Sequence, residues 1–180
     1  MWNLITLDGL FEGEKNWDLD WHEMVWGEEL ERLSIEQLRS VDRLLFGRVT
    51  YEGMAGYWRS AKGEVADLMN SVPKVVVSRT LKEADWNNTT LVGDEAGAAV
   101  RELKRQGDRN MFVFGSARLS EALMDENLFD EYRLALVPVV LRKGRPLFAA
   151  NRDRHKLKLV EARALESGCV ILRYVPAPKA

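Results

Sequence analysis

The sequence predicts an α/β domain in which a mixed, mostly parallel sheet is flanked by helices and ends in an antiparallel hairpin. Through most of the chain, short apolar runs alternate with amphipathic ones, a pattern typical of β–α–β organisation. The central apolar runs are rich in Val, Ile, Leu and Phe without polar alternation, as in parallel strands buried on both faces. From Arg133 onward, strand-like runs follow one another with no helical run between them.

Each element follows from its own pattern. Strands are expected at residues 4–7, 44–46, 74–77, 89–92, 111–114, 133–140, 157–164 and 170–175. Helices are expected at residues 28–41, 49–57, 64–71, 96–106 and 116–127, and Ser34 leaves open whether the first is split in two. In the last helix, Leu119, Ala122 and Leu123 form a core-facing stripe. The final two strands are separated by a short connection containing Gly168, which predicts a closing hairpin.

Composition excludes several classes of protein. The chain of 180 residues is expected to form one domain over residues 1–175, followed by a loose tail at 176–180. A net charge of −2 disfavours a nucleic-acid module. The lone Cys169 excludes an internal disulfide and suits a reducing, cytoplasmic compartment. No signal peptide or membrane span is expected. With Trp26 where a zinc-protease motif beginning at His22 needs its second histidine, no metal site is predicted.

Three strand ends share one design, namely an apolar strand followed by Gly or Ser with a neighbouring arginine. They carry Gly47, Arg48 and Thr50; Ser78 and Arg79; and Gly115, Ser116, Ala117, Arg118 and Leu119. Thr50 and Ser116 are each placed to cap the helix that follows, and free backbone N–H groups there suit a phosphate. Because ligands of open α/β sheets bind outside the carboxyl ends of the strands, the three ends together predict one ligand with several phosphates.

Arginine favours bidentate phosphate contacts, and Arg48 and Arg79 favour a nucleotide with a 2′-phosphate. Taken singly, each strand end is equally an ordinary strand–turn–helix junction with a solvated arginine. The order of the motifs adds more: TLDG (6–9), LLFGRVTYE (44–52), VVVSRTL (75–81), VFGSARLSEAL (113–123) and LFDEYRLALVPVVL (128–141). This order resembles the dihydrofolate reductase-like superfamily, in the branch of the reductase domain of bacterial riboflavin biosynthesis proteins, from residue 4 to about residue 174.

The resemblance implies a three-layer fold, NADPH as the hydride donor and commonly a homodimer. It assigns Gly47, Arg48 and Thr50 to a phosphate-binding helix start, and Ser78 and Arg79 to the adenosine end and its 2′-phosphate. It assigns the turn from Gly115 through Ser116, Ala117, Arg118 and Leu119 to the pyrophosphate. Thr6 and Asp8 then lie beside the nicotinamide and the substrate. The chain departs from the flavin-pathway pattern at Phe114, where an acidic residue is usual, and at Met54, where an aspartate is usual.

The substrate side is less defined. Asp8, Asp20 and His22 are candidates for the proton donor, and each is also readable as a solvated loop residue. Trp21 and Trp58 are expected to line an aromatic slot, although tryptophans at such spacings also serve as core.

These observations favour an NADPH-dependent oxidoreductase acting by direct hydride transfer on a small heterocyclic or imine-type substrate. The substrate classes that the resemblance implies are the riboflavin-pathway pyrimidine, as for a 5-amino-6-(5-phosphoribosylamino)uracil reductase, or a pteridine such as dihydrofolate. The alternative is a non-catalytic, dimeric NADPH-binding module with a decayed substrate pocket. Phe114 and the unassigned proton donor motivate that alternative.

Overall fold

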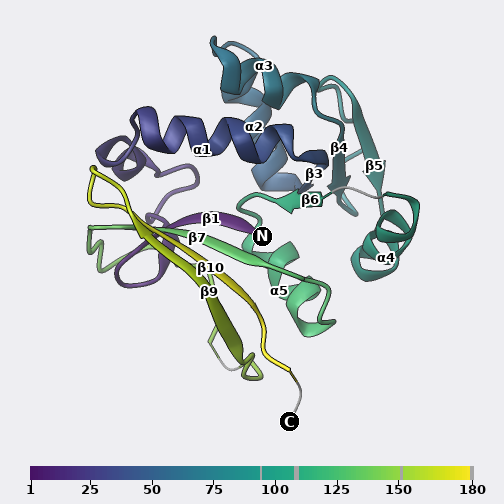
Figure 1. Ribbon diagram of the computed structural model, residues 1–180. Helices are drawn as coiled ribbons and strands as arrows, with labels where there is room; N and C mark the ends of the chain where they lie inside the picture. The colour runs from purple at the N-terminus through teal and green to yellow at the C-terminus, as the bar shows by residue number, and fades with distance from the viewer. Residues whose placement is uncertain (94, 108–109, 151, 179–180) are drawn as a thin grey trace. The chain divides into compact units, whose positions relative to one another are not determined.

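The structure is a computed structural model that describes residues 1–93, 95–107, 110–150 and 152–178 (Figure 1). Its chain forms two compact units, Met1–Leu30 with Phe129–Ala180 and Glu31–Leu128. Each unit contains one four-stranded sheet, and residues 10–12 pair with residues 145–146 in a separate two-stranded sheet, so the strands of the described residues are divided among three sheets rather than gathered in one. Helix α1 (Glu28–Arg39) passes from the first unit into the second without a break at Ser34.

The second unit is built on a parallel sheet. Its strands are β3 (Val41–Gly47), β4 (Lys74–Val77), β5 (Thr89–Val92) and β6 (Asn110–Val113), in the order β5-β4-β3-β6. All three pairings are parallel, and the strands labelled β3 and β4 can be followed in Figure 1. Leu44, Phe46 and Val76 are completely buried. The apolar, non-alternating runs therefore do form strands of a parallel sheet, as predicted.

Helices flank this sheet on both faces. They are α2 (Arg48–Trp58), α3 (Glu64–Ser71), α4 (Ala96–Gln106) and α5 (Ala117–Asp125). The connection β3–α2–α3–β4 and the connection β5–α4–β6 run in opposite directions across the sheet. Because such crossovers are right-handed, they place their helices on opposite faces. Consistently, α2 packs on α3, whereas α5 packs on α4. The predicted helix-flanked parallel sheet is confirmed.

The first unit contains a mixed sheet. Its strands are β1 (Trp2–Thr6), β7 (Tyr132–Val137), β9 (Leu157–Ala164) and β10 (Val170–Pro176), in the order β1-β7-β10-β9. β1 runs parallel to β7, and β10 is antiparallel to both β7 and β9. The turn between β9 and β10 contains Gly168 at φ +83° and closes with a hydrogen bond from the Leu165 N–H to the Cys169 carbonyl, 2.8 Å. The predicted closing hairpin is confirmed.

Three short elements of the first unit are missing from the sequence prediction: β2 (Leu10–Glu12), the 3₁₀ helix η1 (Asp20–Met24) and β8 (Arg145–Pro146). They are too short to carry a periodic pattern. β7 ends at Val137 rather than at residue 140, because Pro138 cannot donate to a ladder. Val41 belongs to β3 rather than to the preceding helix. Pro176 belongs to β10 rather than to a loose tail, and residues 179–180 lie outside the described residues.

Candidate functional site at the carboxyl edge of the parallel sheet

Two helices begin side by side at the carboxyl edge of the parallel sheet. α2 starts directly after β3, and α5 starts after the turn that follows the neighbouring β6. These helices lie on opposite faces, so β3 and β6 flank the topological switch point, where open α/β sheets bind ligands. The N-cap residues Gly47 and Ser116 provide no side-chain cap to their own helices. Uncapped first-turn N–H groups and the helix dipole both favour an anion at this place.

A pair of hydrogen bonds interlocks the two helix starts. The Gly47 N–H donates to Ser116 Oγ at 2.9 Å, and the Ser116 N–H donates to Thr50 Oγ1 at 3.0 Å. Thr50 and Ser116 were predicted to cap their own helices, and they do not. Each hydroxyl oxygen instead accepts an N–H from the end of the neighbouring strand. A hydroxyl that accepts one hydrogen bond still has its own proton to donate. Within the described part of the chain, neither hydroxyl has an acceptor for that proton.

The turn before α5 has an unusual backbone. Gly115 and Ser116 have φ values of +55° and +56°. Serine in this left-handed region costs roughly 1–2 kcal/mol, so the surrounding hydrogen bonds must hold it there. A Cβ added at Gly115 would lie 3.2 Å from Thr50 Cγ2. Only glycine fits here without displacing Thr50, and strain of this kind is concentrated at functional sites.

Three exposed arginines follow the strands that meet at this edge. Arg48 Nη1 contacts both carboxylate oxygens of Glu52, at 2.9 and 3.1 Å. Arg79 and Arg118 form no ion pair among the described residues. An exposed ion pair contributes only about 0–1 kcal/mol, so Glu52 would give up Arg48 easily to a dianionic ligand. Ser78 Oγ accepts the N–H groups of Thr80 and Leu81, at 3.2 and 3.0 Å, and thereby shapes the loop that carries Arg79.

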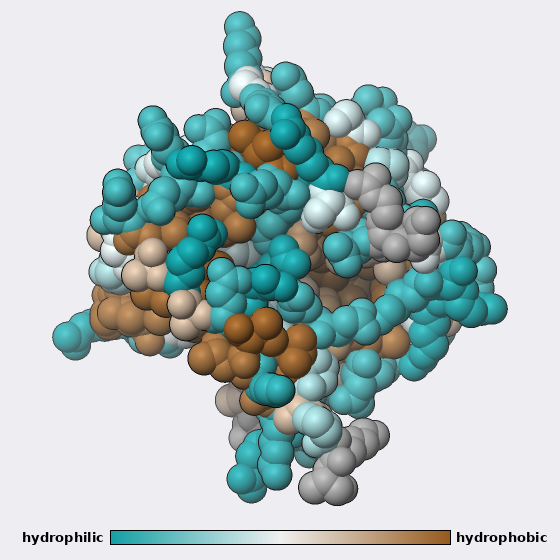
Figure 2. All heavy atoms as spheres, viewed as in Figure 1, coloured by the Kyte–Doolittle hydropathy of each residue, from teal (hydrophilic) through white to brown (hydrophobic). Residues whose placement is uncertain are grey.

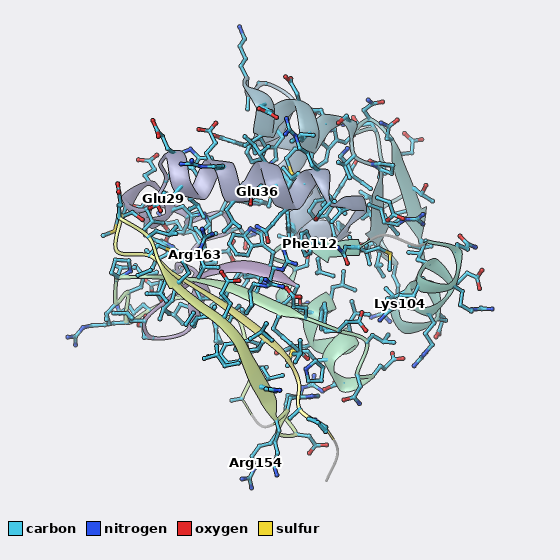
Figure 3. The ribbon with its side chains drawn as sticks, viewed as in Figure 1. Glu29, Glu36, Lys104, Phe112, Arg154 and Arg163 are labelled. Carbon is cyan, nitrogen blue, oxygen red and sulfur yellow. The ribbon has the colours of Figure 1, made fainter. Side chains whose placement is uncertain are left out.

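Two aromatic residues of this unit, Phe114 and Trp58, are predicted to contact substrate. Phe114 is buried, with its ring stacked 5.9 Å from Phe112, which is labelled on β6 in Figure 3, and edge-on to Phe46 at 6.5 Å. Trp58 is the last residue of α2, about 15 Å along the helix from Arg48. The structure thus packs Phe114 into the core and places Trp58 at the far end of α2, away from the carboxyl edge.

In the first unit, hydrogen bonds of the Asp8 carboxylate join residues 6–8 to residues 141–142. The Thr6 hydroxyl donates to Asp8 Oδ1 at 2.5 Å, and the N–H groups of Leu141 and Arg142 donate to the same carboxylate at 3.3 and 2.7 Å. The Thr6 hydrogen bond, with help from these backbone donors, lowers the pKa of Asp8 below its ordinary value. Asp8 is therefore ionised at neutral pH, which is the wrong form for a general acid.

The 3₁₀ helix η1 carries the remaining predicted residues. Trp21 is buried, and the His22 imidazole meets its ring edge-on with centroids 4.3 Å apart. Burial lowers the pKa of His22 to about 4, so the imidazole is neutral at physiological pH. Among the described residues, Trp21 Nε1 and His22 Nε2 are buried without a hydrogen-bond partner, a state that costs roughly 1–3 kcal/mol each. Asp20 is exposed at the start of η1.

A buried polar cluster in the second unit was missed by sequence reasoning. It consists of Lys74, Asn70, Trp86 and the hydroxyl of Tyr51. The only signal was a lysine opening the apolar run 74–77, which is an unusual place for a charge.

Among the described residues, no group of His, Cys, Asp and Glu is arranged to hold a metal ion. No helix within the residues that the structure describes is long and apolar enough to span a membrane.

The fold and the site define an α/β protein whose ligand-binding groups gather at the switch point of a parallel sheet. The chain belongs to the RibD C-terminal domain family, whose sequence model matches residues 1–171. This family is a reductase family. The predicted membership and fold are therefore confirmed.

Relatives in Bacillus subtilis (strain 168) extend over most of the chain. The uncharacterized protein YyaP is 33% identical over 175 residues, covering 94% of this chain and 90% of YyaP. The uncharacterized protein YwjB is 28% identical over 155 residues, covering 86% of this chain and 84% of YwjB. Two full-length sequence relatives therefore share the domain without a stated activity.

Solved structures share the fold at low sequence identity. A putative riboflavin biosynthesis protein from Shewanella sp. PV-4 superposes with a TM-score of 0.79 at 20% identity, covering 98% of this chain and 97% of that one. A diaminohydroxyphosphoribosylaminopyrimidine deaminase/5-amino-6-(5-phosphoribosylamino)uracil reductase from Thermotoga maritima gives 0.72 at 14%, covering 98% and 55%. A pyrimidine reductase-like protein from Corynebacterium diphtheriae gives 0.69 at 12%, covering 99% and 91%. At these identities the likeness establishes the fold alone.

Proposed function

We propose that this protein is an NADPH-dependent oxidoreductase that reduces a small heterocyclic or imine-type substrate by direct hydride transfer. Membership in a reductase family supports the class of reaction. The observation that carries the cofactor assignment is the interlock of Gly47, Thr50 and Ser116, which leaves two hydroxyl protons beside two uncapped helix starts at one sheet edge. Such a set of donors matches the phosphates of a dinucleotide.

The residues at this edge suit distinct parts of the cofactor. The hydroxyls of Thr50 and Ser116 would donate to pyrophosphate oxygens, while Gly115, Ala117 and Leu119 would let the chain approach closely. Arg79, with no ion pair among the described residues, would bind the 2′-phosphate, helped by Arg48 once Glu52 releases it. NADPH, when bound, supplies the hydride. The chain's part is to bind and orient the reactants and to exclude water.

The substrate classes we propose are a pyrimidine of the riboflavin pathway, or a pteridine or dihydrofolate-like ring. The relative from Thermotoga maritima is described as a uracil-type reductase, which supports the first of these. Asp8 is ionised and His22 neutral, so we propose that an ordered water supplies the proton.

A direct experiment measures cofactor binding and turnover separately. Titrations of the purified protein with NADPH and with NADH, followed by calorimetry, should show tighter binding of NADPH. NADPH consumption should then be assayed with the uracil-type intermediate, dihydrofolate and pterins. Oxidation of NADPH that requires one of these substrates supports the proposal. Absence of heat with either dinucleotide would overturn it.

The second candidate function is a non-catalytic NADPH-binding module. Three observations favour it, because each removes a residue predicted to serve the substrate side. Phe114 is packed into the core, Asp8 is ionised and His22 is neutral. This candidate predicts tight NADPH binding with no consumption on any substrate of the panel. The titration and the assay together therefore separate the two functions.

We also propose a cytoplasmic homodimer. Edge strand β9 exposes about half of Leu159 and Val160 (50% and 53%), and apolar side chains reach the surface among polar ones in Figure 2. An exposed apolar edge strand favours pairing with another chain. Cys169 is buried and free, as suits a reducing compartment. Light scattering of the wild type and of Val160→Lys tests this, because a dimer formed through β9 should dissociate in the variant. A monomeric wild type would contradict it.

A further inference from the structure

The Lys74 side chain is completely enclosed in the second unit, and within the described part of the chain its hydrogen-bond partners are all backbone carbonyls. Its Nζ donates to three backbone carbonyls, those of Asn70, Val72 and Asn87, at 3.1, 2.7 and 3.1 Å. The same ammonium lies 4.5 Å from the centroid of the Trp86 ring. Three carbonyl oxygens and one aromatic face form a cage for a cation, which the chain fills with its own ammonium group.

The cage fixes Trp86 from two directions. The ammonium lies over the indole ring, and the indole Nε1 donates to Asn70 Oδ1 at 2.7 Å. The Asn70 side-chain amide donates in turn to the carbonyls of Trp58 and Ala66, both at 2.9 Å. Trp86 is therefore held by charge and hydrogen bonds as well as by packing.

Trp86 contacts the residues on either side of the phosphate-binding segment 47–50. Its ring stacks on Phe46, the residue before Gly47, with centroids 6.1 Å apart. Its backbone N–H donates at 2.8 Å to the hydroxyl of Tyr51, the residue after Thr50. Movement of Trp86 would therefore shift both ends of this short segment together.

We infer that Lys74 is a positioning residue for the candidate site, acting through Trp86 on Phe46 and Tyr51 to set the geometry of residues 47–50. The inference rests on the proposed function, because it makes affinity for NADPH depend on a buried ammonium that touches no cofactor. The partners of the cage are uncharged. Asp85, the residue before Trp86, forms an ion pair with Arg59 at 2.6 Å, and that pair lies at the surface.

Lys74→Met tests this, since methionine keeps the apolar stem and removes the charge and the three donors. We expect the dissociation constant for NADPH to rise about tenfold. Amide hydrogen exchange at Gly47 and Ser116, whose N–H groups donate across the two helix starts, should accelerate by about the same factor, with smaller changes at β5 and α4. Lys62→Met, at an exposed lysine of the same unit, is the matched control and should change neither quantity.

Chemical rescue identifies the group responsible. In Lys74→Ala, n-propylammonium should restore the slow exchange at Gly47 and Ser116, whereas n-propanol, which lacks the charge, should not. Should both Lys74 variants fail to fold, Tyr51→Phe decides, since it removes only the acceptor of the Trp86 N–H. We expect it to weaken NADPH binding about threefold with accelerated exchange confined to the same residues.

The two hypotheses fail in different ways. Wild-type protein that binds no NADPH would overturn the proposed function, while the exchange measurements would still test the role of Lys74. A folded Lys74→Met protein with wild-type exchange at Gly47 and Ser116 would overturn the positioning role. Acceleration spread evenly over the second unit would also overturn it, because that is the signature of general destabilisation.

Discussion

Thr50 Oγ1 accepts the backbone N–H of Ser116 at 3.0 Å, although 66 positions separate the two residues in the sequence. This bond ties the first turn of α2 to the entry of α5. It also satisfies the N–H of a serine held at φ +56°. The two helix starts are consequently coupled, and a substitution at either should change the geometry of the other.

Thr50→Val should therefore destabilise the protein and weaken NADPH binding. Valine has the shape of threonine but leaves the Ser116 N–H without its acceptor, a loss of roughly 1–3 kcal/mol. Thermal unfolding and calorimetric titration measure the two effects. Thr50→Ser retains the hydroxyl and should behave nearly as wild type. A Thr50→Val protein with unaltered NADPH affinity would remove this hydroxyl from the site.

Gly115→Ala should cost about 1–2 kcal/mol in the free energy of unfolding, because alanine is strained at φ +55°. Its Cβ would also lie 3.2 Å from Thr50 Cγ2 and push against the interlock, so NADPH affinity should fall as well. The matched control is Gly56→Ala in α2, where an added Cβ meets nothing within 4 Å. That change should stabilise the helix by roughly 0.5–1 kcal/mol and leave binding unaltered. Equal effects of the two substitutions would contradict the role of the turn.

Arg79→Ala should weaken binding of NADPH by about tenfold while affecting NADH little, since only NADPH carries the 2′-phosphate. Arg48→Ala should have the same sign but a smaller effect, because Glu52 already occupies its guanidinium in the ligand-free protein. Paired titrations with the two dinucleotides give the ratio directly, and Lys82→Ala in the same exposed loop is the control. Equal losses for NADPH and NADH would disprove the assignment of the 2′-phosphate.

The pH dependence of stability offers a separate test of the Lys74 cage. Burial lowers the pKa of Lys74 from 10.5 to about 8. Between these values the unfolded chain binds the proton that the folded protein lacks, so stability rises with pH across this window. The free energy of unfolding of the wild type, measured relative to Lys74→Met, should therefore increase from about pH 8 to 10.5. Cys169, whose pKa burial raises to about 11, is common to both proteins and cancels in the difference. A flat difference would show that the carbonyls and the Trp86 ring fully offset the hydration that the ammonium loses on burial.

The regular elements of the parallel sheet were predictable because their signal is local. The run from Leu44 to Phe46 is apolar without alternation, and the helical stripe at Leu119 and Leu123 is equally plain. The division of the strands into separate sheets was not predictable, since β1 pairs with β7 across more than a hundred residues of sequence. A periodic pattern reports burial of a strand but not the identity of its partner.

Part of the candidate site was predictable from local sequence, and part depends on contacts between distant residues. Gly47 and Gly115 mark the strand ends by composition, and the topology brings these ends to one edge. The use of the Thr50 and Ser116 hydroxyls across the edge could not be foreseen, because local capping is the ordinary role of such residues. Likewise, nothing in the sequence distinguishes a tryptophan packed at the far end of a helix, such as Trp58, from one that lines a pocket.

His22 should make the protein sensitive to acid. Burial lowers its pKa from 6.5 to about 4, so between these values the unfolded chain binds a proton that the folded protein does not. Stability should accordingly fall as the pH decreases from 6.5 to about 4, by up to about 3 kcal/mol. Urea unfolding across this range measures the loss, and His22→Phe, which keeps a ring but cannot titrate, should abolish most of the slope. His155→Phe is the matched substitution at the other histidine, which is partly exposed. An unchanged slope in His22→Phe would mean that the imidazole is accessible to water, and so is free to act as the proton donor after all.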